Sequence, residues 1–294
     1  MALKEFIVPS TVSGMRVSDY LREILPDLSE STIRKLFADR DVKLDGIRVS
    51  RDRALESGQV IKVYIPDRKD STVSSFPSFS IVYEDDDILL VNKRSGISVE
   101  KDAHGGVTLS DLCAEYTSRK NPDSSPPAAC HRLDNKTCGL CLFAKNPRSL
   151  DILQNVFRER TLEKYYICLV RGIMKPCRAE CRAWLVKDPL RSKVRITDHP
   201  EPDAKPIITG YEMLDAGPVS RLRIHLITGR THQIRAHLAA LGHPVLGDDL
   251  YGDRDFNHRE KARSLKLCAV SLKLYTNGRL PQLDGRDFSI DPPF

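Results

Sequence analysis

Hydrophobic and polar positions predict a small folded domain at the start of the chain. Within residues 16–37, apolar residues recur at the spacing of amphipathic helices, and the pattern predicts two of them. Alternating residues on both sides of Asp45-Gly46, a turn-forming pair, predict a hairpin, and residues 59–65 alternate as a last strand. We therefore expect residues 1–66 to form a compact ααβ domain.

A second, larger domain is predicted over residues 81–294. Residues 67–80 are rich in serine and proline and lack periodicity, which is typical of a flexible linker. Short alternating runs beyond the linker predict strands joined mainly by hairpins, and helical patterns occur at residues 149–160 and 231–241. This arrangement predicts an α+β domain with a mixed, mostly antiparallel sheet.

Composition and charge narrow the function classes only a little. The chain has 46 basic and 40 acidic residues, and its net charge of +6 suits a polyanionic partner. No apolar run reaches the ~20 residues of a membrane-spanning helix, and residues 1–10 lack an apolar signal core. We therefore expect a cytoplasmic protein without membrane contacts. The eight cysteines are scattered, which predicts reduced thiols rather than a disulfide framework.

A charged, turn-like segment at residues 131–139 (HRLDNKTCG) leads directly into an apolar strand predicted over residues 140–143. Charges at the mouth of a buried strand make Asp134 a candidate for chemistry. The alternative is a solvated loop in which Asp134 only caps a turn. The local pattern leaves both interpretations open.

Two further segments carry candidate side chains. Residues 228–238 begin where a predicted strand ends, and Thr231 is expected to cap the helix that follows. His232 and Arg235 would share one face of that helix, where a guanidinium either holds a carboxylate or is solvated. Strand alternation puts Lys164 and Tyr166 on one face, so the tyrosine is either a core residue or a platform for a base.

Four C-terminal segments resemble the motifs of the ribosomal large-subunit (RluA-type) pseudouridine synthases. HRLDNKTCG resembles the catalytic motif, ILLVNKRSGISV the opening strand, and KYYICLVRG and TGRTHQIRAHLAALGHPVLGDDLYG the later motifs, in the right order. The N-terminal stretch LPDLSESTIRKLFADRDVKLDGIRV resembles the ribosomal S-four-like RNA-binding domain that many members carry, with Asp41 and Asp45 in place of the more typical glycine and asparagine. Together these segments cover nearly the whole chain.

The resemblance implies an RNA pseudouridine synthase that acts on a uridine flipped out of structured ribosomal or transfer RNA. Asp134 would be the essential carboxylate, as nucleophile or as base, and Arg235 would pair with it. Arg132 would enter the RNA stack, and Tyr166 would stack on the target uracil. The isomerisation needs no cofactor and no metal. Other RNA contacts are expected from His131, Lys164, Arg230, His232, Arg34, Lys35 and Arg48.

Two alternatives to the enzyme are open to test. The first is a zinc-supported RNA-binding module, for which the candidate ligands are Cys138, Cys141, Cys177 and Cys181. The second is a catalytically silent RNA-binding protein, which would lack the motif aspartate or arginine that this chain has. Cys138, Arg94 and Cys268 stand where the family more often has serine, proline and histidine. No protein partner is implied, and a monomer is expected.

Overall fold

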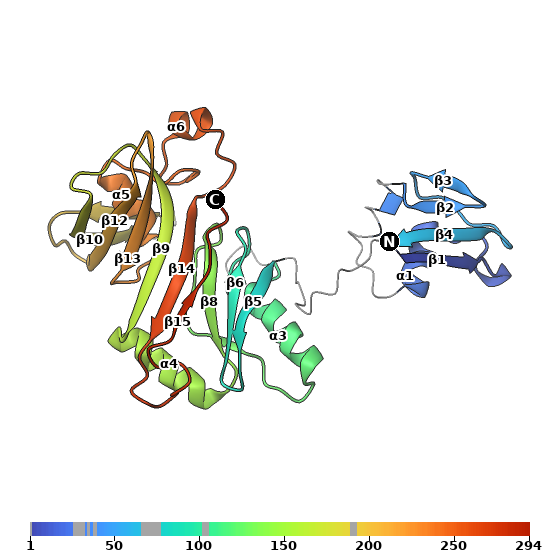
Figure 1. Cartoon of the computed structure of the whole chain (residues 1–294), viewed down its shortest axis with the longest axis horizontal. Coiled ribbons are helices and arrows are strands. Elements are labelled where there is room, and N and C mark those ends of the chain that lie inside the picture. Colours follow the sequence, from blue (N-terminus) through green and yellow to red (C-terminus); the bar gives the residue numbers. More distant parts are fainter. Residues whose placement is uncertain are drawn as a thin grey trace. The chain divides into compact units, whose positions relative to one another are not determined.

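The chain divides into two compact units, which are described separately. The computed structural model describes residues 2–25, 33, 36–37, 40–65, 78–101, 106–188 and 193–294. Contacts between Cα atoms separate Met1–Thr72 from Val73–Phe294 (Figure 1). Most of the predicted linker, residues 67–80, lies outside the described residues. Its end was placed too late, because the buried Phe79 already begins a strand that includes Ser80.

The N-terminal unit is a four-stranded antiparallel sheet with a hydrophobic core of its own. Its strands run in the order β1-β4-β2-β3, and α1 shares their core. The elements are β1 (Ala2–Ile7), the 3-10 helix η1 (Ser10–Val12), α1 (Val17–Ile24), β2 (Val42–Leu44), β3 (Ile47–Val49) and β4 (Val60–Ile65). The predicted hairpin is confirmed, because Asp45 (φ 49°) and Gly46 (φ 81°) form the left-handed turn between β2 and β3.

The other predictions for this unit have mixed outcomes. The first helix and the last strand are confirmed as α1 and β4. The second predicted helix lies mostly outside the described residues. Three of its residues, Ile33, Leu36 and Phe37, are described, and they are helical and buried. The β1 strand was not predicted, because the adjacent Lys4 and Glu5 interrupt the alternation of apolar residues; the strand is held by its pairing with β4.

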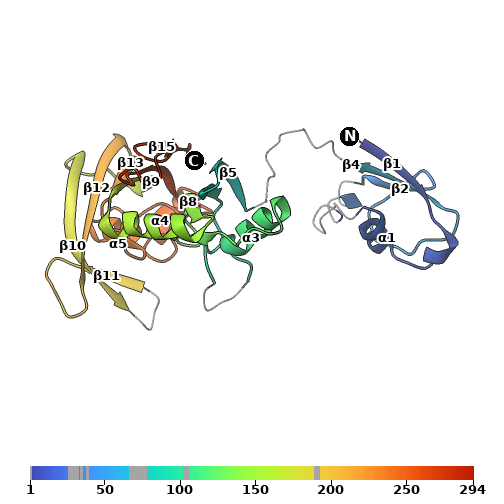
Figure 2. The ribbon, with the colours of Figure 1, turned by 90° about the horizontal axis from the view of Figure 1, so that it is seen from below.

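The C-terminal unit is built on one large sheet, which confirms the predicted α+β class with a mixed, mostly antiparallel sheet. Its main path runs β11-β10-β12-β13-β9-β14-β8-β6-β5, with β15 beside β14 and β7 beside β8. The strands are β5 (Phe79–Glu84), β6 (Ile88–Lys93), β7 (Ala128–Ala129), β8 (Cys138–Ala144), β9 (Leu162–Arg171), β10 (Arg178–Asp188), β11 (Lys193–Thr197), β12 (Lys205–Asp215), β13 (Val219–Leu226), β14 (Leu267–Leu274) and β15 (Asp287–Ser289). Both ribbon views place β10 and β12 at one end of this unit and β5 with α3 at the other (Figures 1 and 2).

Helices cover both faces of this sheet. Leu89 and Phe143 pack with α3 (Leu109–Lys120) and α5 (Gln233–Ala240) on one face. Leu90 and Leu142 pack with α4 (Pro147–Glu159) on the other face, as the alternation of strand residues requires. The short α6 (Arg254–Arg259) follows α5. None of the described helices is long and apolar enough to cross a membrane.

The only parallel pairing among the described strands joins β8 to β14. Gly139 in β8 has a φ of 114°, and a Cβ at this position would lie 2.2 Å from the carbonyl oxygen of Ala269 in β14. Glycine is therefore required for the close approach of the two strands. This contact fixes the base of the loop that precedes β8, which carries Asp134.

Candidate active site

The loop between β7 and β8 is held by a buried lysine. Lys93, at the end of β6, is fully buried, and its Nζ donates hydrogen bonds to the backbone carbonyls of Arg94 (3.0 Å), Ile97 (2.8 Å) and Asn135 (2.9 Å). The N–H of Thr137 donates to the backbone carbonyl of Asp134 at 3.0 Å. These contacts hold the backbone beside Asp134, whose side chain is 22% exposed.

The buried Lys93 predicts a characteristic pH dependence of stability. Burial lowers its pKa to about 8, although neighbouring acidic groups act in the opposite direction. In the unfolded chain the pKa of lysine is about 10.4, so between these values the unfolded state binds more protons and stability rises with pH. Relative to a Lys93→Met variant, the wild-type free energy of unfolding should therefore rise by up to about 1.4 kcal/mol per pH unit across this range.

Urea unfolding followed by tryptophan fluorescence measures this difference. Trp184, the only tryptophan, lies in β10 and so reports on the C-terminal unit. The cost of burying the charged Lys93 should be fully present below pH 8. A difference between wild type and variant that does not change with pH would contradict this account.

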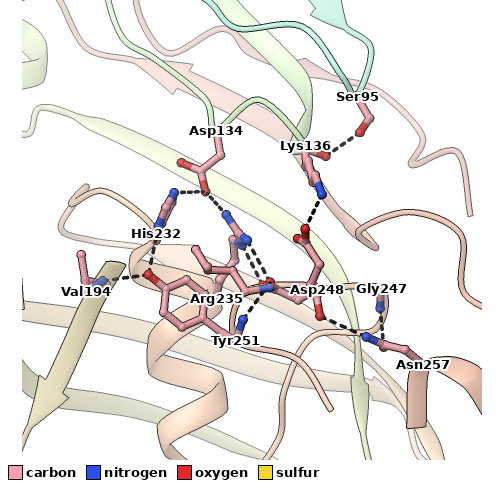
Figure 3. A network of polar contacts seen from close by, with 12 residues as sticks. Ser95, Asp134, Lys136, Val194, His232, Arg235, Gly247, Asp248, Tyr251 and Asn257 are labelled. Atoms are coloured by element: carbon pink, nitrogen blue, oxygen red, sulfur yellow. Dashed lines mark hydrogen bonds and ion pairs between the residues drawn. The ribbon is translucent and has the colours of Figure 1, made fainter. Parts of the chain in front are cut away.

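Arg235, in α5, links two carboxylates. Its Nη1 donates to Oδ2 of Asp134 at 3.0 Å, while its Nε and Nη2 donate to Oδ2 and Oδ1 of Asp248 at 2.7 and 2.8 Å (Figure 3). Burial opposes the charge on Arg235, but the hydrogen bonds and charges of both aspartates outweigh burial and raise its pKa. The structure thus brings together the two residues that the sequence analysis paired, with a permanent cation orienting Asp134.

The turn before α5 differs from the prediction. The N-cap residue is His232, in a left-handed conformation with φ 55° and without a side-chain cap, so the predicted cap at Thr231 is wrong. The side chain of Gln233 orders the turn instead. Its Oε1 accepts hydrogen bonds from the hydroxyl of Thr228 (2.9 Å) and the N–H of Arg230 (3.1 Å). These bonds supply the order that a capping hydroxyl provides elsewhere.

The left-handed turn points His232 at Asp134. Its Nε2 lies 3.8 Å from Oδ2 of Asp134, and its Nδ1 lies 3.0 Å from the hydroxyl of Tyr251. The Tyr251 hydroxyl accepts a bond from the N–H of Val194 at 2.8 Å, so its own proton can be donated to Nδ1. Burial lowers the pKa of His232, against the charge of Asp134, and favours the neutral ring. A neutral His232 with this bond carries its hydrogen on Nε2, facing Asp134.

Asp134 lies in a cleft with a strong excess of basic groups. The cleft has a volume of about 570 Å³, and Asp134 is the only carboxylate among the described residues that line it. The basic side chains in its lining are Arg132, Arg158, Arg160, Lys164, Arg230 and Arg235. Such a lining attracts a phosphate-bearing ligand towards the single carboxylate.

All eight site residues predicted for the C-terminal domain line this cleft. They are His131, Arg132, Asp134, Lys164, Tyr166, Arg230, His232 and Arg235. Tyr166 is 6% exposed, and burial together with the charge of Asp134 raises its pKa, so its hydroxyl stays protonated. Burial and the charge of Arg160 lower the pKa of Lys164 to about 8. Arg132 and Arg230 are exposed.

The side chain of His131 lines the cleft but also contacts neighbouring parts of the fold. Its Nε2 accepts a hydrogen bond from the N–H of Leu142 at 3.2 Å, and its ring stacks on Phe157 at a centroid distance of 4.9 Å. The imidazole therefore helps to fix the loop against β8 and α4. Arg158 and Arg160 also line the cleft but were not singled out from the sequence. The signal was present as two arginines on either side of Glu159, just before β9.

The N-terminal candidates lie in the other unit. Arg48 is exposed on β3, whereas Arg34 and Lys35 lie outside the described residues. The zinc alternative fails on geometry, because Cys138 and Cys141 of β8 belong to different clusters on opposite faces of the sheet. Within the described ranges, no group of three or more metal-binding side chains is placed to hold an ion.

Known proteins resemble this chain over most of its length. A sequence family described as RNA pseudouridylate synthase matches residues 87–240, which include Asp134, Tyr166 and Arg235. Ribosomal large subunit pseudouridine synthase C of Vibrio vulnificus is 34% identical over 85% of this chain and 80% of that protein. The Salmonella typhi protein of the same name is 33% identical over 92% and 88%. Among solved structures, human RNA pseudouridylate synthase domain containing 1 is 27% identical, with a TM-score of 0.60, over 75% of this chain and 86% of that one.

Proposed function

Since the chain belongs to the RNA pseudouridylate synthase family and is an RNA-modifying isomerase, we propose that Asp134 is its catalytic carboxylate and large-subunit ribosomal RNA its substrate. The observation that carries the proposal is the partly exposed carboxylate of Asp134 in a basic cleft, held there by the buried Arg235. The names of the curated relatives support ribosomal RNA as the substrate class.

The reaction rearranges bonds within one nucleotide. The bond between uracil N1 and the sugar carbon C1′ breaks, the uracil turns while it stays bound, and C5 bonds to C1′. C5 then loses its proton and N1 gains one, so the product is an isomer of the substrate. Asp134 serves either by attacking the sugar or by removing a sugar proton. Both roles require an ionised carboxylate of fixed direction, and the hydrogen bond from Arg235 fixes that direction.

The cleft walls suit a nucleotide that has left its stack. Flipping a base out of structured RNA costs a few kcal/mol, which contacts with the protein must offset. We assign this role to the buried ring of Tyr166, which stacks on the uracil, and to the exposed Arg132, which enters the vacated space. Lys164 and Arg230 hold the neighbouring phosphates, and His131 and His232 complete the walls.

Mapping of pseudouridines in total RNA, from cells with and without this gene, tests the substrate. One or more positions in large-subunit ribosomal RNA should lose the modification when the gene is absent. Loss confined to transfer RNA would replace the proposed substrate and keep the activity. Purified protein should also release tritium from RNA labelled at uracil C5; absence of release from every RNA tested would favour a silent RNA-binding protein.

We further propose that the N-terminal unit is an S-four-like domain that binds RNA through phosphate contacts. Exposed Arg48, Arg51 and Arg53 support this role, and the sequence resemblance implies that Arg34 and Lys35, which lie outside the described residues, also contact RNA. The unit has its own core, so its removal leaves the core of the C-terminal unit whole.

Deletion of residues 1–66 should therefore weaken RNA binding, while the rate at which bound RNA is converted stays within a few-fold of the wild-type rate. If three phosphate contacts are lost, the plot of log affinity against log salt concentration should become less steep by about 2 to 3 units. Filter binding of ribosomal RNA fragments over a range of salt concentrations measures this. The single variant Arg48→Gln should reduce the slope by about 1. An unchanged slope after the deletion would remove the N-terminal unit from the RNA interface.

We also predict that the enzyme acts as a monomer in the cytoplasm, without a metal or cofactor. Light scattering of the purified protein tests the first point, and activity after exhaustive treatment with a chelator tests the independence from metal ions.

A further inference from the structure

Asp248 is a buried carboxylate that the proposed reaction does not use. It follows α5 in the chain, its side chain is 0% exposed, and it lies beyond the residues matched by the family. Its Oδ1 also accepts hydrogen bonds from the backbone N–H groups of Leu250 (2.8 Å) and Tyr251 (3.0 Å). With the two bonds from Arg235, the carboxylate thus accepts four hydrogen bonds, three at Oδ1 and one at Oδ2.

The backbone around Asp248 is tightly built. Its carbonyl oxygen accepts a hydrogen bond from Nδ2 of Asn257 at 3.0 Å, and its N–H donates to the carbonyl of Val245 at 3.2 Å. A Cβ on Gly252 would lie 1.9 Å from the same carbonyl oxygen. Asp248 is therefore a rigid anchor rather than a side chain that follows its partner (Figure 3).

This anchor restricts Arg235 in two ways. Two of its three nitrogens are bound to Asp248, so Nη1 is the nitrogen that reaches Asp134. One guanidinium also faces two carboxylates, and the more buried of them, Asp248, takes the shorter bonds. Asp248 already compensates the positive charge of Arg235. Arg235 therefore orients Asp134 but neutralises the negative charge of Asp134 less than an arginine without a second partner would.

We propose that Asp248 is a positioning residue for the isomerisation: it holds Arg235 in place and shares its charge, so that Asp134 is oriented and still reactive. The inference rests on the proposed role of Asp134. Asp248 does not touch the cleft and acts only through Arg235.

Several other groups influence Asp134 and must be constant in any test. The titratable and charged side chains around it are Arg235, His232, Tyr166, Tyr251, Lys93, Arg132 and Asp248. An Asp248→Asn substitution changes only one of these charges and keeps the shape of the side chain. The guanidinium of Arg235 then loses its anionic anchor, so the direction that it gives to Asp134 is no longer fixed.

In Asp248→Asn, kcat on ribosomal RNA should fall about 10- to 100-fold, with KM within about threefold, because a misplaced reacting group affects the chemical step. The matched control is Asp249→Asn: the neighbouring carboxylate is exposed and pairs with Lys136 at the surface, so kcat should stay within twofold of the wild-type value. A kcat of Asp248→Asn that returns to within twofold of wild type, once it is corrected for the fraction of folded protein, would overturn the proposal.

A double-mutant cycle with Arg235→Gln decides whether Asp248 acts through the arginine. If it does, Arg235→Gln combined with Asp248→Asn has the same kcat as Arg235→Gln alone, within about twofold. Independent, multiplicative losses would overturn the inference. The double variant is also the better folded one, because neither charge is buried without its partner. If wild-type protein forms no pseudouridine, the proposed function fails; if it does and Asp248→Asn retains kcat, only this inference fails.

Discussion

Replacement of Asp134 by asparagine is expected to abolish turnover, by at least about 10⁴-fold, while affinity for the RNA stays within about threefold. The carboxylate is the reacting group, whereas the basic walls of the cleft, which the substitution leaves unchanged, supply the binding. An asparagine oxygen can still accept the hydrogen bond from Arg235 but can neither attack a sugar nor remove its proton.

The fold should tolerate this substitution. Asp134 is partly exposed and Arg235 is compensated separately by Asp248, so stability should change by no more than about 1 kcal/mol. Tritium release under single-turnover conditions measures the chemistry, and filter binding measures affinity. Asp151→Asn, at an exposed position of α4, is a control that should retain full activity. Near-native turnover of Asp134→Asn would show that another group is the catalyst.

Local residue patterns predicted those parts of the site that lie within one element. Alternation along β9 correctly placed Lys164 and Tyr166 on the same wall of the cleft. Helical periodicity placed His232 and Arg235 at the start of one helix, although it misplaced the cap. There the side chain of Gln233 orders the turn, and a hydrogen bond of this kind has no sequence signature comparable to an N-terminal serine or threonine.

The meeting of Asp134 with Arg235 is of a different kind. The two residues are 101 positions apart in the chain. Asp134 precedes β8 and Arg235 follows β13, and they meet through the order of strands in the sheet, in which β14 and β9 lie between β8 and β13. The close parallel contact at Gly139 is one condition for that order. Local patterns do not encode strand order, so the pairing was reached only through the family resemblance. Asp248 lies within the last of the motifs that carry this resemblance but was assigned no role, because a single aspartate in a loop carries no periodic signal.

Replacement of Arg235 by glutamine should cost both activity and stability, in contrast to Asp134→Asn. The substitution leaves the Asp248 carboxylate buried without its cation, a defect that typically costs about 3 to 5 kcal/mol. The orientation of Asp134 is lost as well, so kcat should fall at least about 100-fold. Urea unfolding monitored by Trp184, which lies in the same unit, measures the loss of stability.

The pH dependence of that loss identifies Asp248 as its source. In the wild type, burial raises the pKa of Asp248 but the bonds and charge of Arg235 outweigh it, so the net pKa is lowered. This pair therefore contributes stability above the unfolded pKa of about 3.9, which is lost as the pH falls through the folded pKa.

Without Arg235, burial acts unopposed by a cation and raises the pKa of Asp248. The defect of Arg235→Gln should then shrink as the pH falls from 7 towards about 5, and it should be independent of pH when Asp248→Asn is added. A defect in Arg235→Gln that is the same at every pH would mean that the instability arises elsewhere than at the unpaired carboxylate.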